Sequence, residues 1–252
     1  MNYKHILKIE ELSMNAWPSY KIELYDKWLI RFSHQYTYRT NCVEQVGPSE
    51  IDIEKKIDYC EEIYKEYKTP ANFKINPIMP ESFDKLLESR GYEIKHVTNV
   101  MTMSLDNFNH KPDPNIDIIL SDTITDDWIT GLFTINGTTN KVHLAIVPSM
   151  FKAIPKRTFV ACIKENGRMV ASGLGILDRD DLGVYAIYVA ESERKKGYAK
   201  SICATIINKG IEMGAKYSYL QVVKGNSPTI NLYESLGYKY DYTYWFRSKE
   251  TH

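Results

Sequence analysis

From Leu182 to Lys200 the sequence reads LGVYAIYVAESERKKGYAK. The run from Leu182 to Ala190 is almost entirely apolar and does not alternate, which is typical of a central strand covered on both faces. Beyond Gly197, apolar residues recur at helical spacing as far as Met213, and this predicts a long helix. The stretch therefore sets a basic loop between a buried strand and a helix, and the rest of the chain is interpreted from that arrangement.

The basic loop has the composition of an anion-binding site. Arg194, Lys195 and Lys196 precede the helix, where the helix dipole favours negative charge rather than positive. Gly197 permits a close approach of the backbone, and Ala199 offers only a methyl group as an obstacle. Free N–H groups together with cations would hold a phosphate. The charges alone leave a second interpretation open, namely a solvated basic loop.

A second motif follows at residues 226–238, which read NSPTINLYESLGY. The pattern Arg-x-x-Gly-x-Ala at Arg194 resembles the cofactor signature of the GNAT superfamily of N-acetyltransferases. The downstream stretch looks like that superfamily's Asn-x-x-Ala-x-x-Leu-Tyr-x-x-x-Gly-Phe segment, from which Thr229 and Tyr238 depart. Both motifs have the order and separation of the family, and the resemblance covers the chain from about Ile116 to the C-terminus.

The resemblance implies acetyl-CoA as the acyl-donor cosubstrate, with no metal. The splayed end of the central strand would pair with the pantetheine arm, and a backbone N–H there would polarise the thioester carbonyl. The basic loop would wrap the pyrophosphate, and an asparagine would bind the cofactor near the second motif. The implied cofactor-binding residues are Ile187, Tyr188, Val189, Arg194, Lys195, Lys196, Gly197, Tyr198, Ala199, Lys200 and Asn226.

Tyr233 is the catalytic residue that the resemblance implies. It would stand close to the sulfur and protonate the departing thiolate, since a phenol titrates near ~10 and keeps its proton at neutral pH. The alternative is an aromatic helix residue that packs on the sheet. The general base has no such candidate, because the positions where relatives carry a glutamate hold Tyr185, Tyr188 and Gln221. Asp180, Asp181 and Glu191 are the nearest acids, and each would act through water.

The front half of the chain resembles the back half without its loop. Residues 87–92 (LESRGY) and 233–238 (YESLGY) both lead from a helix through Gly-Tyr into a long strand, which favours a tandem duplication over two unrelated junctions. Prolines and Asx residues between Asn107 and Asn115 indicate a linker. We therefore predict an α/β fold with a mixed sheet and two GNAT-like domains. Residues 1–110 form a degenerate domain, and residues 116–252 form the domain that binds acetyl-CoA.

The front half offers no cofactor motif of its own. Its equivalent turn, residues 43–50, reads VEQVGPSE and carries acids where phosphates would lie. A strand is expected from Tyr38 to Val46. We predict that this domain walls the acceptor pocket, and the aromatic stretch from Trp28 to Tyr38, with Arg31 and Arg39 nearby, would face it. Packing of those aromatic rings in the core is the alternative.

The composition limits the remaining function classes. Lys plus Arg and Asp plus Glu both total 32, so the basic surplus typical of nucleic-acid binders is absent. The charged start of the sequence leads us to expect no signal peptide, and no apolar run reaches membrane-spanning length. The four scattered cysteines predict reduced thiols in a cytoplasmic protein. A generic nucleotide site is disfavoured, because the glycine spacing matches neither common phosphate-binding fingerprint.

The predicted function is the transfer of acetyl from acetyl-CoA to a primary amine by direct attack. The acceptor would be a small molecule or a peptide, with no nucleic-acid or membrane partner. Without a carboxylate at Gln221, an acyl-CoA-binding protein that does no catalysis is the alternative. The sequence does not decide between a monomer and a homodimer.

Overall fold

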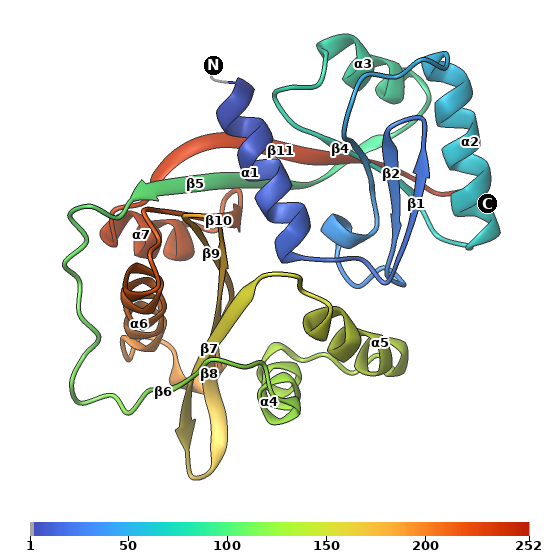
Figure 1. Ribbon diagram of the computed structural model, residues 1–252. Helices are drawn as coiled ribbons and strands as arrows, with labels where there is room; N and C mark the ends of the chain where they lie inside the picture. The colour runs from blue at the N-terminus through green and yellow to red at the C-terminus, as the bar shows by residue number, and fades with distance from the viewer. Residues whose placement is uncertain (1–2, 252) are drawn as a thin grey trace.

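The computed structural model describes residues 3–251, and its centre is one mixed sheet (Figure 1). The strand order across the sheet is β1-β2-β3-β4-β11-β5-β10-β9-β8-β7-β6. In chain order the strands are β1 (Lys21–Tyr25), β2 (Trp28–Phe32), β3 (Val43–Gln45), β4 (Ala71–Ile75), β5 (Glu93–Ser104), β6 (Ile119–Ser121), β7 (Arg157–Glu165), β8 (Arg168–Asp178), β9 (Asp181–Val189), β10 (Tyr217–Val223) and β11 (Lys239–Lys249). The α/β class with a mixed sheet that the sequence predicts is confirmed.

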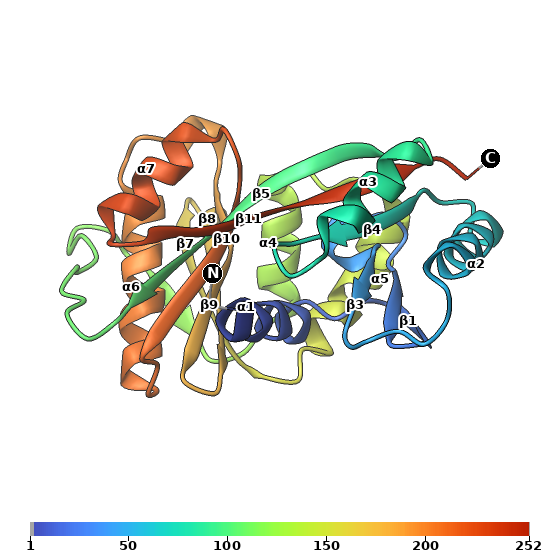
Figure 2. The ribbon, with the colours of Figure 1, turned by 90° about the horizontal axis from the view of Figure 1, so that it is seen from above.

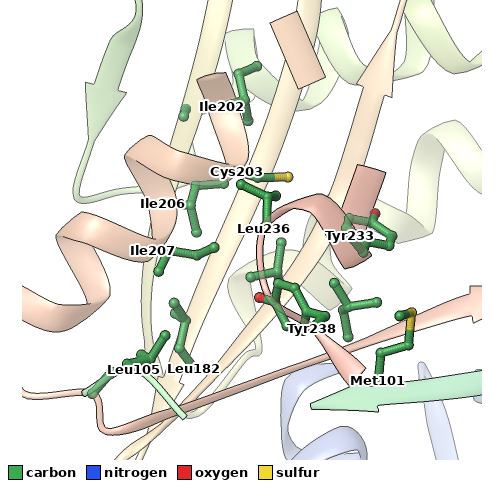
Figure 3. Close-up of a cluster of buried hydrophobic side chains, with 14 of the residues drawn as sticks. Met101, Leu105, Leu182, Ile202, Cys203, Ile206, Ile207, Tyr233, Leu236 and Tyr238 are labelled. Carbon is green, nitrogen blue, oxygen red and sulfur yellow. The ribbon is translucent and has the colours of Figure 1, made fainter. Parts of the chain in front are cut away.

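Helices cover both faces of this sheet. They are α1 (Tyr3–Ala16), α2 (Ile53–Glu66), α3 (Glu81–Ser89), α4 (Asp126–Asn136), α5 (Lys141–Lys152), α6 (Tyr198–Glu212) and α7 (Ser227–Ser235), with 3-10 turns η1 (Tyr38–Thr40) and η2 (Glu191–Glu193). In the back half, α6 and α7 pack on one face and α1 packs on the other. Figure 3 shows the first of these clusters, in which Cys203 and Ile206 of α6 meet Tyr233 and Leu236 near α7.

The order of elements in the back half agrees with the prediction. From β6 to β11 the chain runs β-α-α-β-β-β-α-β-α-β. One expectation in the front half is wrong: the segment from Tyr38 to Val46 is a 3-10 turn followed by the short strand β3. The reason is the Asn41 side chain, whose Oδ1 accepts hydrogen bonds from the backbone N–H groups of Ser33 and Gln35 at 2.6 and 2.9 Å. These bonds close a turn in place of strand pairing.

The two halves exchange their last strands. β5 of the front half pairs with β10 of the back half, and β11 of the back half pairs with β4 of the front half. β5 and β11 pair with each other at the centre (Figure 2). The parallel pair β3–β4 in the front matches the parallel pair β9–β10 in the back. The sheet is thus continuous from one half to the other, and the division at residues 110–116 stays a prediction.

The repeated Gly-Tyr motif has the same geometry in both halves. Gly91 and Gly237 have φ values of +85° and +104°, a region that suits glycine because other residues meet a Cβ clash there. The following tyrosines donate their backbone N–H groups to Leu87 and Tyr233 at 3.0 and 3.1 Å. Each helix therefore ends in the same left-handed cap, which supports the proposed duplication.

Candidate active site

An opening between β9 and β10 is the first part of the candidate site. The two strands pair in parallel only over Asp181–Gly183 and Tyr217–Tyr219, although both continue beyond these residues. The strands therefore part at their C-terminal ends. Backbone N–H and C=O groups seek hydrogen-bond partners, and those along the parted edge of β9 are open to a ligand that would lie against the strand. The predicted residues Ile187, Tyr188 and Val189 are in this part of β9.

A β-bulge lies at the point of divergence. In the pairing of β8 with β9, Ser172 is opposite Tyr188 and Leu174 is opposite Tyr185, so β9 carries one additional residue. Ala186 has a φ of +49°, and the Ser172 hydroxyl donates to its carbonyl at 2.9 Å. A bulge changes the direction of the backbone N–H groups beside it. A bulge of this kind can direct an N–H toward a carbonyl oxygen held between the strands.

The loop from β9 to α6 forms the second part of the site. Lys195 and Gly197 both have left-handed backbones, with φ values of +67° and +80°. No side chain caps α6, and its first turn contains no acid. The first N–H groups of a helix have no partner inside it, so this N-terminus can accept an anion. The predicted residues from Arg194 to Lys200 are brought together here.

Two of the three cations in this loop already have acidic neighbours. Lys196 is paired with Glu193, and Arg194 is 3.9 Å from Glu191. The acids of η2 thus offset part of the positive charge that opposes the helix dipole. Lys195 and Lys200 form no ion pair with any residue between 3 and 251, and both are exposed. These two lysines are therefore free to contact a phosphate.

Asn226 and Tyr233 lie on the other side of the opening, on α7. Asn226 is the N-cap of α7, and its Oδ1 accepts from the Thr229 N–H at 3.4 Å. Tyr233 is buried among the residues of α6 and β10, and Ile187 and Val189 pack against the same cluster. Burial raises the pKa of the Tyr233 phenol well above its ordinary value. Tyr233 therefore keeps its proton at neutral pH.

A polar cluster occupies the face of the sheet opposite α6 and α7. The Tyr185 hydroxyl donates to Tyr219 at 2.9 Å, and burial raises the pKa of Tyr185 to about 12. Gln221 donates to Ser13 of α1 at 2.7 Å, and its Oε1 accepts from Tyr244 and from Arg39. No local pattern indicated Ser13 or Tyr244 as neighbours of Gln221, because they are 208 and 23 positions from it along the chain.

The three acids expected as general bases acting through water do not lie beside the bulge. Asp180 and Asp181 lie at the first end of β9, where Asp181 is 2.5 Å from Lys8. Ile187 is six residues further along, or roughly 20 Å at the rise of a strand. Neither aspartate can therefore act on a substrate at the bulge through a single water. Glu191 is exposed in η2 and faces Arg194.

A pocket of about 610 Å³ lies between α4 and α5. Its lining includes Ile129, Phe133, Leu144 and Pro148, and none of the predicted site residues. We assign the chemistry to the β9–β10 opening instead, because the unpaired backbone and the uncapped helix lie there. Among residues 3–251, no cluster of side chains suited to a metal ion was found. In the same part of the chain, no helix is both long enough and apolar enough to cross a membrane.

Comparison with known proteins gives one family and many related folds. The family described as "Probable histone acetyltransferase Rv0428c C-terminal" matches residues 4–246 of the chain, whereas no curated protein sequence matches it. A GCN5-related N-acetyltransferase from Kribbella flavida superposes with a TM-score of 0.72 at 12% identity, covering 96% of this chain and 95% of that one.

Two further solved structures have the same fold. A tandem GNAT protein from the clavulanic acid biosynthesis pathway has a TM-score of 0.64 at 9% identity, covering 83% of this chain and 74% of that one. A GCN5-related N-acetyltransferase from Sphaerobacter thermophilus has a TM-score of 0.59 at 17% identity, covering 79% and 68% respectively. At such identities the likeness concerns the fold.

Proposed function

The chain belongs to the Rv0428c C-terminal family of probable histone acetyltransferases, within the GNAT superfamily, and from that premise we propose that it transfers acetyl from acetyl-CoA to a primary amine. The observation that carries this proposal is the juxtaposition of the β9 bulge, the parting of β9 from β10, and the uncapped N-terminus of α6. The bound thioester would supply the activated acetyl group. The acceptor would be a small molecule or a peptide.

The residues present fit such a ligand. The parted edge of β9 offers backbone hydrogen bonds to an extended chain carrying amides. The N-terminus of α6, with Lys195 and Lys200 free, offers N–H groups and positive charge to a pyrophosphate. The fit supports one cofactor site per chain, since the front half lacks the equivalent loop.

The proposed reaction is a direct attack without a covalent enzyme intermediate. The nitrogen lone pair of a neutral amine forms the new C–N bond, and an N–H at the bulge stabilises the oxyanion. The C–S bond then breaks, the Tyr233 hydroxyl gives its proton to the leaving thiolate, and the phenolate takes up a proton from water. The amine proton passes to water, because no carboxylate belongs to the cluster around Tyr185 and Gln221. Positioning of the amine beside the thioester would supply much of the acceleration.

The missing carboxylate also favours a second candidate, an acyl-CoA-binding protein that does no catalysis. Calorimetric titration with CoA, followed by incubation with acetyl-CoA and an amine panel, separates the two. Release of free thiol together with an N-acetyl product seen by mass spectrometry supports the transferase. Binding of CoA without turnover of any amine supports the binding protein. The absence of CoA binding contradicts both.

Tyr233→Phe tests the proposed acid. We expect kcat to fall by about 100-fold, since a positioned general acid contributes roughly 100-fold or more, while the affinity for CoA is kept. Tyr217→Phe is the matched control, because Tyr217 is exposed at the opposite end of β10. A Tyr233→Phe enzyme with the rate of the wild type would remove the acid from the mechanism.

A further inference from the structure

Arg39 is a half-buried cation at the junction of the two halves. It lies in η1, and its Nη1 donates to the Oε1 of Gln221 on β10. The other buried or half-buried arginines of the described chain all have carboxylate partners: Arg31 meets Glu44, Arg90 meets Asp58 and Glu61, and Arg247 meets Asp84 and Glu88. Among residues 3–251, no carboxylate oxygen lies within 4 Å of Arg39.

The side chains that contact Arg39 or lie beside it include an amide and two phenols, and one of the phenols, Tyr244, is also near the Lys74–Glu10 ion pair. Gln221 is an amide, and Tyr185 and Tyr244 are phenols whose pKa values are raised by burial despite the opposing charge of Arg39. Burial and the charge of Arg39 lower the pKa of the nearby His96 imidazole, which favours its neutral form at neutral pH. A guanidinium that is partly removed from water gains stability from a nearby anion, which offsets part of its lost hydration. Arg39 has at most one of its five N–H donors in use in the contacts shown.

Arg39 lies near the β9 bulge, because its partner Gln221 is close to Tyr185. Continuing the parallel register, in which Tyr219 is opposite Gly183, sets Gln221 level with Tyr185. Tyr185 precedes Ile187 by two residues, or roughly 7 Å along the strand. Tyr185 and Gln221 belong to the α1 face of the sheet, which is opposite the face covered by α6 and α7. Arg39, which is hydrogen-bonded to Gln221, therefore lies on the α1 face close to the level of the bulge.

We propose that the acceptor is a small amine that also carries a carboxylate, and that Arg39 binds this carboxylate while the amine attacks at the β9 bulge. This inference rests on the proposed acetyl transfer. The planar guanidinium matches a carboxylate with two parallel N–H···O bonds, and Gln221 holds the guanidinium in position. Arg39 would therefore determine specificity without taking part in bond making or breaking.

Matched acceptor pairs test this inference. The probes are glycine, β-alanine, γ-aminobutyrate and the protein amino acids, each beside its primary carboxamide, with acetyl-CoA and the full chain. Since a hydrogen-bonded charge contributes roughly 10- to 100-fold, we expect kcat/KM for the best carboxylate probe to exceed that of its carboxamide by at least about tenfold. In Arg39→Gln this ratio falls toward one through an increase in KM, and Arg39→Lys recovers part of it.

Arg157→Gln is the matched control, because Arg157 is exposed at the far end of β7 and forms no ion pair in the described chain. It should keep the discrimination of the wild type. Thermal melting and CoA titration show whether each variant is folded. The ratio of kcat/KM between carboxylate and carboxamide probes is also measured on the wild-type protein, so this part of the test does not depend on any variant folding. Equal rates for carboxylate and carboxamide probes would overturn the inference and leave acetyl transfer standing. The inference would also be overturned if the enzyme acetylated other amines but none of the probes that carry a carboxylate. Failure of CoA binding would instead contradict the proposed function.

Discussion

The turn from β3 to α2 in the front half and the turn from β9 to α6 in the back half have opposite electrostatic designs. In the front turn, the Asp26 carboxylate accepts from the N–H groups of Glu50 and Ile51 at 3.0 Å. Asp52 then caps α2 by accepting from Glu54 and Lys55. In the back turn no side chain caps α6. The front turn supplies its own anions, whereas the back turn leaves its N–H groups for an anion from outside.

This difference explains how one architecture can keep or lose a cofactor site. Both turns follow a strand that has a parallel neighbour, and both lead into a helix of similar length. In the front turn, Asp26 binds the N–H groups that precede α2, Asp52 is the N-cap of α2, and Glu54 lies in its first turn. The buried Lys56, 3.1 Å from Asp26, then neutralises the charge. The front half carries Arg39 in η1, which contacts Gln221 on the face of the sheet where we propose that the acceptor binds.

The largest effect is expected when an acid like that in the first turn of α2 is placed in the first turn of α6. Ala199 is the second residue of α6, where α2 has Glu54. In Ala199→Glu we expect the affinity for CoA to fall on the order of 100-fold, because like charges brought together cost several kcal/mol. Ser89→Glu adds the same charge at the exposed end of α3 and should leave the affinity unchanged. Calorimetry measures both, and equal affinities would show that the pyrophosphate does not bind at α6.

A smaller loss of CoA affinity is expected from Lys195→Gln. Lys195 has no acidic partner in the described chain and stands beside the uncapped helix. Removal of one charge-assisted contact to a phosphate should weaken binding by about tenfold. The dependence of affinity on salt concentration should also decrease. Lys55→Gln removes an exposed lysine from the first turn of α2 in the front half, and a comparable loss in that variant would mean that the two turns are not as different as proposed.

Asp26→Asn changes the anion in the front turn and affects stability rather than binding. Backbone hydrogen bonds, that of Ile51 first, hold the pKa of Asp26 below its ordinary value of 3.8. Such a carboxylate adds stability above that pH, and the gain is lost as pH falls through the lower, folded pKa. Urea unfolding should show the variant less stable than wild type at neutral pH, with the gap closing below about pH 4. A gap that stays constant across this range would contradict the assignment.

The smallest effects concern the two turn glycines. Gly197 has a φ of +80°, so Gly197→Ala should cost about 1 kcal/mol of unfolding free energy. Gly47 is outside the left-handed region, and a Cβ there would meet only the flexible Lys27 side chain, at 3.3 Å. Gly47→Ala should therefore stay within about 0.5 kcal/mol of wild type. Thermal melting of both variants checks the contrast, and equal costs would mean that backbone conformation is not what distinguishes the two turns.

Local patterns in the sequence predicted most elements of this protein, and the segment from Tyr38 to Val46 was an exception. The apolar run ending at Ala190, the basic loop and the Gly-Tyr junctions each report on their own backbone, because capping, burial and helix periodicity act over a few residues. They predicted the strand, the turn and the helix that make the opening between β9 and β10. They also predicted which half carries the cofactor motif.

Tertiary structure alone decided which side chains surround Gln221 on β10. The exchange of β5 and β11 between the halves brings Tyr244 and α1 beside Gln221. The hydrogen bond from Arg39 to Gln221 joins residues 182 positions apart. No local pattern encodes such a contact, because strand pairing and helix packing over long distances decide which side chains meet. The sequence by itself determined a basic turn between a buried strand and an uncapped helix, and the packing of the two halves determined that Arg39 lies beside Gln221.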